Sequence, residues 1–311
     1  MVRKNQETIN AFLPVCVLAS SFIMLLASCA TVPGTVALAE DAGDAFAFLD
    51  PGGLVYVTLD APQSRPILDR VSLGGIKGNQ LAQALDMTDT AAAAFYSPED
   101  GRGFLLAARG RYPSSRLRFS LGLSADWKKK RSETGGRYWR SEKDRLSVYV
   151  DSRYALISGG DPFPHTGGVA APECFGEFSK GAVLAGWVPD AESLIGRFLA
   201  DMAIPLLIPA DLLVFGVYPA EGDAANSGPF FAKLRLELPS PSHAGALMSM
   251  LAMVRSYFVN PDLPEAGGFP PAPLLFANVP IQDGSSLILR TDGMDAEKIA
   301  LLFTAFPVYS K

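Results

Sequence analysis

Residues 1–29 decide in which compartment this chain folds. Arg3 and Lys4 lie near the start, and an apolar run from Ala11 to Leu26 follows, interrupted by one proline and two serines. The run is shorter than the ~20 residues that a transmembrane helix needs, which disfavours the alternative of a plain membrane anchor. A basic start, a short apolar run and a small-residue site predict a secretory signal that is removed after export. We therefore expect residues 1–28 to be a signal peptide.

The end of this run, Leu26-Ala27-Ser28-Cys29, resembles the lipobox of bacterial lipoproteins. The resemblance implies that cleavage leaves Cys29 first and that its thiol is acylated. Because stable anchoring takes two acyl chains, an acylated protein of this kind stays on the membrane without further help. The residue after Cys29 is Ala30 rather than Asp, which in the lipoprotein sorting rule favours the outer membrane. The resemblance thus implies an exported, lipid-anchored protein, located on the periplasmic leaflet of the outer membrane.

Composition bounds the mature chain. Removing Arg3, Lys4 and Glu7 with the signal leaves 25 basic and 31 acidic residues in 29–311, a net charge of −6. Cys174 is then the one cysteine without an assigned fate, so no intramolecular disulfide can form. In an oxidising compartment a lone thiol is usually buried. The length suffices for one large core or two smaller ones.

The pattern along the chain predicts five segments. They are residues 1–28 (signal peptide), 29–50 (acylated N-terminus and tether), 51–160 (first α/β unit), 161–180 (a linker rich in Gly and Pro) and 181–311 (second α/β unit). Apolar residues at helical spacing predict helices over 64–86, with a glycine break, and over 114–128, 190–208, 241–258 and 295–306. Short β-rich runs bounded by turn residues predict the strands between them.

The order of these elements repeats. The run 104–109 matches 230–235, and each is followed by a proline (Pro113, Pro239) and a helix. We therefore predict an α+β fold made of two diverged β-α-β-β-α-β-type units. Mostly antiparallel sheet would be flanked by about five amphipathic or apolar helices.

Motifs for catalysis or metal binding are not found in the sequence. His165 and His243 have no Cys, Asp or Glu at metal-ligand spacing, and no P-loop, EF-hand or nucleophile-elbow pattern occurs. We expect no enzymatic activity, no cofactor and no metal.

Charge is nearly absent from two predicted helices of the second half. Residues 202–208 carry none, and residues 244–259 carry one, Arg255. A helix that is apolar all round is either buried in protein or in contact with lipid, and methionines suit an adaptable surface. Core packing and lipid contact both remain open. The candidate lipid-contact residues are Leu194, Phe198, Met202, Leu206, Leu207, Leu247, Met248, Leu251, Val254 and Phe258.

A basic block occupies residues 109–145, with twelve Lys and Arg against four Asp and Glu. Basic residues attract anionic head groups, and Trp and Tyr prefer the membrane interface. The interface candidates are Lys128, Lys129, Lys130, Arg131, Trp127 and Trp139. A solvated helix end is the other interpretation, and the exported location argues against nucleic acid as a partner.

The lipobox, an α/β body of this size and several apolar helices together resemble the treponemal concealed outer-membrane lipoproteins. The resemblance implies insertion of amphipathic helices into the bilayer and a change in outer-membrane permeability. It assigns no functional residue other than Cys29. We accordingly expect membrane lipids as partners. The alternatives are a periplasmic module that binds an apolar ligand and a structural or assembly partner in the envelope, whose protein partners the sequence does not name.

Overall fold

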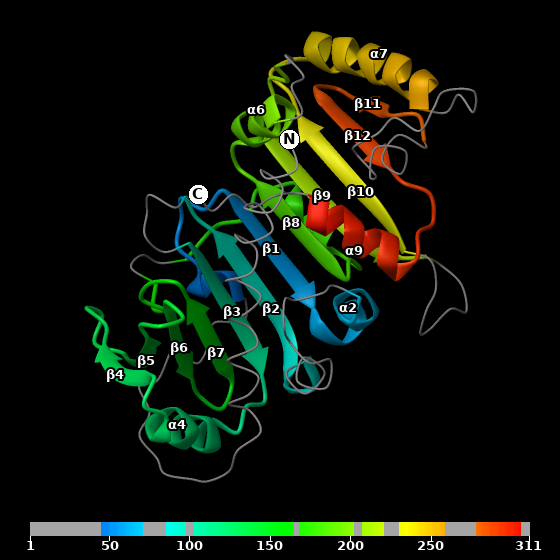
Figure 1. Cartoon of the computed structure of the whole chain (residues 1–311). Helices are drawn as coiled ribbons and strands as arrows, with labels where there is room; N and C mark the ends of the chain where they lie inside the picture. The colour runs from blue at the N-terminus through cyan, green and yellow to red at the C-terminus, as the bar shows by residue number, and fades with distance from the viewer. Residues whose placement is uncertain are drawn as a thin grey trace, which may run out of the picture. The chain divides into compact units, whose positions relative to one another are not determined.

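The computed structural model describes residues 45–70, 85–97, 103–164, 168–201, 207–220, 230–258 and 278–305. These residues form an α+β protein with antiparallel sheet and several helices, as predicted (Figure 1). The chain divides into two compact units, with the boundary between Ala170 and Ala171. Residues 66–70 group with the second unit. The signal peptide and Cys29 lie outside the described residues.

The first unit begins with a short 3-10 helix, and its strands and helices follow in chain order. They are η1 (Ala45–Phe48), β1 (Val55–Asp60), α2 (Ala61–Leu68), β2 (Thr88–Phe95), β3 (Phe104–Gly110), α4 (Ser114–Leu123), β4 (Trp127–Arg131), β5 (Arg137–Ser141), β6 (Leu146–Val150) and β7 (Tyr154–Ser158). The strand order is β1-β2-β3-β7-β6-β5-β4, and every neighbouring pair is antiparallel. β2 and β3, which follow each other in the chain, thus form an antiparallel hairpin.

Helix α4 covers one face of this sheet. Leu117 and Leu121 are four residues apart, so they share one face of the helix, and both are buried. They belong to one core cluster with residues of β4 to β7, among them Leu146, Val148 and Ile157. β6 and β7 are buried along their whole length.

Residues 45–50, the described end of the tether expected over residues 29–50, are packed. Phe46, Phe48 and Leu49 are each at most 5% exposed. The hydroxyl of Tyr96 donates to the carbonyl oxygen of Asp50 at 2.9 Å. Burial of two phenylalanines gives this stretch a hydrophobic driving force that a solvated tether would lack. Residues 45–50 are therefore part of the first unit.

The second unit alternates strands and helices in a similar way. Its elements are α5 (Phe175–Ser179), β8 (Leu184–Val188), α6 (Ala191–Asp201), β9 (Leu212–Pro219), β10 (Phe230–Glu237), α7 (Pro241–Phe258), β11 (Ile281–Asp283), β12 (Ser286–Arg290) and α9 (Ala296–Ala305). The strand order is β8-β9-β10-β12-β11, again antiparallel throughout. Helix α7 packs beside β11 and β12, and α9 packs against β10 (Figure 1).

Helix α7 has the bounds predicted from the sequence. Ser240 precedes it, and its hydroxyl accepts a hydrogen bond from the backbone N–H of His243 at 3.4 Å. Pro241 takes the first helical position, where a missing N–H costs nothing. These two residues account for where the helix begins. The last helix, α9, also lies within the range predicted for it, 295–306.

Two predicted helices are too long. The helix expected over 114–128 ends at Leu123, because Ser124 is extended and the following residues pair as a strand. The basic residues 128–131 are thus on β4. The helix expected over 190–208 ends at Asp201, Leu207 is not helical, and residues 202–206 lie outside the described part. Residues 71–84, where part of the first predicted helix falls, are likewise not described.

Candidate membrane-contact surfaces

Strands β4 and β5 form a hairpin that carries the predicted basic residues. β4 is the last strand in the order of the first unit, so it has one strand neighbour among the described residues. The register of the two strands pairs Lys128 with Arg140, Lys129 with Trp139, Lys130 with Tyr138 and Arg131 with Arg137. Two of these pairs therefore set like charges directly opposite each other.

Both faces of this hairpin carry cations. Side chains alternate along a strand and directly paired residues share a face. Lys128 and Lys130 therefore lie on one face with Arg140, and Lys129 and Arg131 lie on the other with Arg137. All four β4 cations are exposed. The hairpin thus presents positive charge in two directions.

The two tryptophans of the hairpin are core residues, which corrects their placement at a membrane interface. Trp127 is 9% exposed and Trp139 is 7% exposed, and both pack in the same cluster as Leu117 and Leu121 of α4. Lys129 lies over the Trp139 ring, with its Nζ 5.7 Å from the ring centroid. The rings therefore fix the hairpin to the body of the first unit and are not presented to a membrane in this conformation.

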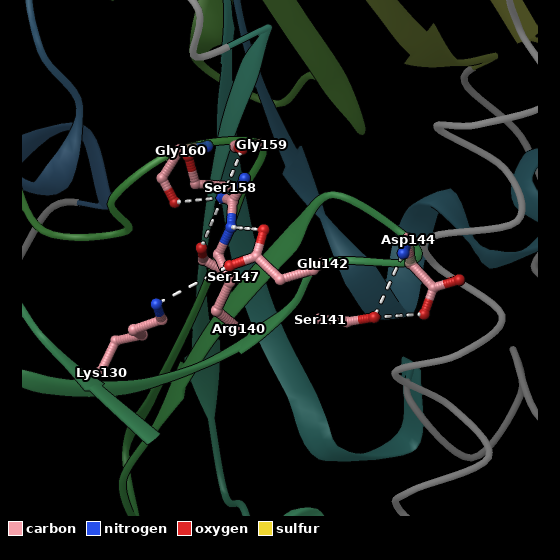
Figure 2. A network of polar contacts seen from close by, with 9 residues as sticks. All are labelled: Lys130, Arg140, Ser141, Glu142, Asp144, Ser147, Ser158, Gly159 and Gly160. Atoms are coloured by element: carbon pink, nitrogen blue, oxygen red, sulfur yellow. Dashed lines mark hydrogen bonds and ion pairs between the residues drawn. The ribbon is translucent and has the colours of Figure 1, made fainter. Parts of the chain in front are cut away.

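Arg140 ties the hairpin to the turn after β7 (Figure 2). Its Nη1 donates to the hydroxyl of Ser147 at 3.0 Å and to the carbonyl oxygen of Gly159 at 2.7 Å. Glu142 lies 3.8 Å from both Lys130 Nζ and Arg140 Nε. Arg140 is thus a structural cation, held by backbone and hydroxyl acceptors.

The remaining hairpin cations have no carboxylate partner within the described part of the chain. Lys128, Lys129, Arg131 and Arg137 form no ion pair there. Their charge is left for solvent or for an external anion.

The candidate residues of the α6 region are described only in part. Leu194 is half-buried on α6, and Leu207 is 68% exposed in the segment before β9. Phe198 belongs to α6, but its side chain is not described, and Met202 and Leu206 lie outside the described residues. Of the two described side chains in this group, that of Leu207 has the exposure that fits contact with lipid.

Helix α7 has a buried and an exposed face. Leu247 and Leu251 are each 8% exposed and face the sheet, together with the fully buried Ala244. Met248 is half-buried, whereas Met253 is 68% exposed. Val254 and Phe258 belong to the helix, but their side chains are not described. Of the α7 candidates, Leu247 and Leu251 are therefore core residues in this conformation.

The exposed face of α7 carries no formal charge up to Met253; the side chain of Arg255, near the end of the helix, is not described. Between Pro241 and Val254 the sequence contains no Asp, Glu, Lys or Arg. The exposed positions after the first turn are Ala246, Ser249, Ala252 and Met253. A helix on the surface of a globular protein ordinarily bears charged and polar residues on its outer side.

A second exposed apolar site on α4 was not singled out in the sequence. Phe119 is 47% exposed and Leu123 is 71% exposed, and both point away from the face that holds Leu117 and Leu121. The spacing of residues 119 and 123 could have indicated this site, since residues four apart share a helix face. The pattern was hard to recognise because the apolar residues of α4 occupy two faces of the helix.

Residues that could hold a metal ion or react as a nucleophile were sought in the described part of the chain. No group of His, Cys, Asp and Glu in it could hold a metal ion. Cys174 is half-buried, and burial is the main cause that raises the pKa of its thiol, so the reactive thiolate is disfavoured. Among the helices that the structure places, none is long and apolar enough to cross a membrane. His243 donates or accepts at Ser240, 2.8 Å away, and is exposed.

No family model and no curated protein matches the sequence. Three crystal forms of TP0453, a treponemal protein, match the structure. Form III gives a TM-score of 0.54 at 16% identity, covering 84% of this chain and 98% of that one. Form I gives 0.56 at 14%, covering 86% and 99%, and form IV gives 0.55 at 16%, covering 84% and 96%. At these identities the likeness is one of fold alone: 84–86% of this chain shares its fold with TP0453.

Proposed function

We propose that the mature chain is a non-enzymatic envelope lipoprotein, acylated at Cys29, that contacts the bilayer through helices of its second unit and thereby alters membrane permeability. The proposed location is the periplasmic leaflet of the outer membrane. The observation that carries the proposal is the exposed face of α7, which has no charged residue among its described side chains, Pro241 to Met253. The shared fold with a treponemal lipoprotein and the lipobox at residues 26–29 add support.

Contact with lipid would not require α7 to leave the sheet. Leu247 and Leu251 hold its inner face against the protein, while Met253 and the alanines of the outer face remain available to acyl chains. Each Å² of apolar surface that leaves water contributes about 25 cal/mol. A helix lying in the interface with its outer face toward the acyl chains is therefore consistent with the folded second unit.

The sequence carries the proposed anchor. A thiol at Cys29 that receives two or three acyl chains would keep the second unit beside the bilayer, so that weak contacts of α7 suffice. Replacing Cys29 by Ser is expected to abolish incorporation of a labelled fatty acid in cells. If the Cys29→Ser protein still takes up the label, Cys29 is not the site of acylation.

Vesicle flotation tests the helix contact. The mature chain, residues 29–311 with Cys29→Ser, would be mixed with vesicles of neutral phosphatidylcholine. Met253→Asp puts a charge on the outer face of α7 and is expected to reduce flotation while leaving the thermal melt unchanged. Ala171→Asp is the matched control, since it adds the same charge at an exposed position outside the helix. Equal flotation of parent, variant and control would remove α7 from the proposal.

We also infer that the two units are diverged copies of one ancestral unit. Each runs strand, helix, strand, strand and helix before its last strands. In each, the third strand pairs with the second and with the last strand of the unit, as β3 does with β2 and β7 and β10 does with β9 and β12. The runs 104–109 and 230–235 lie on these corresponding strands. A superposition of β3 on β10 that brings the other strands into register would support common descent.

A further inference from the structure

Positive charge is concentrated on the β4–β5 hairpin. Residues 127–142 contain six cations, at 128–131, 137 and 140, and two acids, Glu133 and Glu142, so their net charge is 6 − 2 = +4. The whole chain carries −5. This short segment therefore has the opposite sign to the molecule that bears it.

The arrangement of these cations works against the stability of the hairpin. Like charges placed directly opposite each other on neighbouring strands are destabilising. Lys128 faces Arg140 and Arg131 faces Arg137 in the register. Lysines on an edge strand are commonly explained as protection against pairing with another sheet. That explanation covers β4, but not Arg137, because β5 has β4 on one side and β6 on the other.

Exposed apolar side chains lie on the helix next to this charge. Helix α4 contacts β4, and its outer side presents Phe119 and Leu123. The inner side of α4 and the hairpin tryptophans share one core cluster, which holds the helix and the hairpin in fixed positions. Cations and exposed apolar groups are therefore combined on one rigid part of the first unit.

We propose that this part of the first unit, the β4–β5 hairpin with the exposed side of α4, docks on the surface of an anionic phospholipid bilayer. Head-group phosphates accept hydrogen bonds from Lys129, Arg131 and Arg137, which share the face of the hairpin that Trp127 and Trp139 pack against α4. An arginine fork can hold one phosphate with two parallel bonds. Phe119 and Leu123 enter the boundary between head groups and acyl chains. An acidic polymer could pair with the cations but would leave the two apolar side chains in water. A bilayer provides contacts for both, so we infer a bilayer as the partner.

The proposal deepens the proposed function, on which it depends for the presence of a membrane. It assigns a lipid class, anionic phospholipid, and a second contact that is independent of α7. The two contacts also differ in kind, since the α7 face has no charge and the hairpin contact is largely electrostatic.

The test uses flotation of the mature Cys29→Ser chain with two vesicle compositions, phosphatidylcholine alone and phosphatidylcholine with phosphatidylglycerol. The hairpin variant is Arg131→Gln with Arg137→Gln, two exposed cations on the α4 side of the hairpin that have no ion pair in the described residues. The matched control is Lys180→Gln with Lys298→Gln, which removes the same charge from exposed positions of the second unit. Thermal melts of both variants verify that they fold.

The hairpin variant is expected to bind phosphatidylglycerol vesicles roughly 30-fold more weakly than the parent, at about fivefold for each cation lost. The control should stay close to the parent, and neutral vesicles should not distinguish the three proteins. Raising the ionic strength from about 0.1 M to about 1 M shortens the screening length from ~10 Å to ~3 Å and should remove most of the difference. Leu123→Ser should weaken binding to the same vesicles without any change of charge.

Four results would overturn the proposal. Equal losses in the hairpin variant and the control would mean that overall charge, and not the hairpin, drives binding. Competition by inorganic phosphate beyond that of chloride at equal ionic strength would indicate a site for the free anion. If the protein binds soluble polyglutamate through the hairpin but does not bind vesicles, the partner is an acidic protein, whatever the effect of Leu123→Ser. If Met253→Asp loses vesicle binding and the hairpin variant does not, α7 is the membrane contact and the hairpin is rejected. If the hairpin variant loses binding and Met253→Asp does not, α7 is rejected.

Discussion

Replacing Arg140 by alanine should loosen the basic hairpin. The guanidinium is the donor for the Ser147 hydroxyl and for the Gly159 carbonyl oxygen, at 3.0 and 2.7 Å. Hydrogen bonds from a charged donor contribute about 1.5–3 kcal/mol each, and the side chain is 21% exposed, so we take the low end of that range for both. Relief of the repulsion from Lys128 opposes the loss by a few tenths of a kcal/mol. The expected cost is about 2–3 kcal/mol in the free energy of unfolding.

Two measurements check this estimate. Urea denaturation gives the change in stability. Limited trypsin digestion reports locally on the hairpin, because Lys128 to Arg131 are cleavage sites that a firmly paired strand protects. Lys130→Ala is the matched control, since its ion pair with Glu142 is exposed and long at 3.8 Å, and should cost less than about 0.5 kcal/mol. Arg140→Lys, which keeps the charge but not the planar fork, should fall between the two.

The reasoning depends on Arg140 acting through its acceptors and not through its charge. If Arg140→Lys is as stable as the parent, the charge alone is sufficient and the assignment of the two hydrogen bonds is wrong. If Arg140→Ala resembles Lys130→Ala in both stability and trypsin sensitivity, the link from the hairpin to the turn after β7 contributes nothing measurable.

Three further outcomes follow from burial and close approach. Leu251→Ala removes a core side chain and should lower the free energy of unfolding by about 2–5 kcal/mol, whereas Met253→Ala should change it by less than about 0.5 kcal/mol; urea melts of the pair decide whether α7 has the described faces. Gly110→Ala would drive its methyl group into the backbone carbonyl of Met87 and should cost about 1–3 kcal/mol or more by the same assay, and a neutral result would contradict the described approach of the two chains. Because burial raises the pKa of the Cys174 thiol, its alkylation at pH 8 should be slower than that of free cysteine and should speed up as the pH rises above 9; a rate equal to that of free cysteine would mean that the thiol is not shielded.

Periodicity and turn residues in the sequence predict most of the elements. Helix α7 is delimited by Ser240 and Pro241, and the β2–β3 hairpin by the turn residues between its strands. These signals are local, since a cap or a turn acts through residues within a few positions of each other. The match between 104–109 and 230–235 is local in the same sense, and both runs are strands.

The sequence pattern did not predict the β4–β5 hairpin, because the contacts that stabilise it join residues far apart in the chain. Residues 124–131 continue a helical spacing from Leu117 and Leu121, and Lys and Ala are good helix formers. They form a strand because Trp127 and Trp139 bury on one face only when β4 pairs with β5, and because β5 is itself held by β6. Packing between residues that are distant in the sequence therefore outweighs the helix propensity of this segment.

The amino-acid sequence by itself predicts an export signal and acylation at Cys29, and it determines the α+β class and the low charge of α7, since each depends on residue type and short-range spacing. The tertiary structure alone decided which apolar residues are core and which are exposed. Leu251 and Met253 are two positions apart and equally apolar in the sequence, yet one is 8% and the other 68% exposed. Only the placement of α7 against β11 and β12 separates them, because burial is a property of the neighbours that a side chain meets and not of the side chain itself.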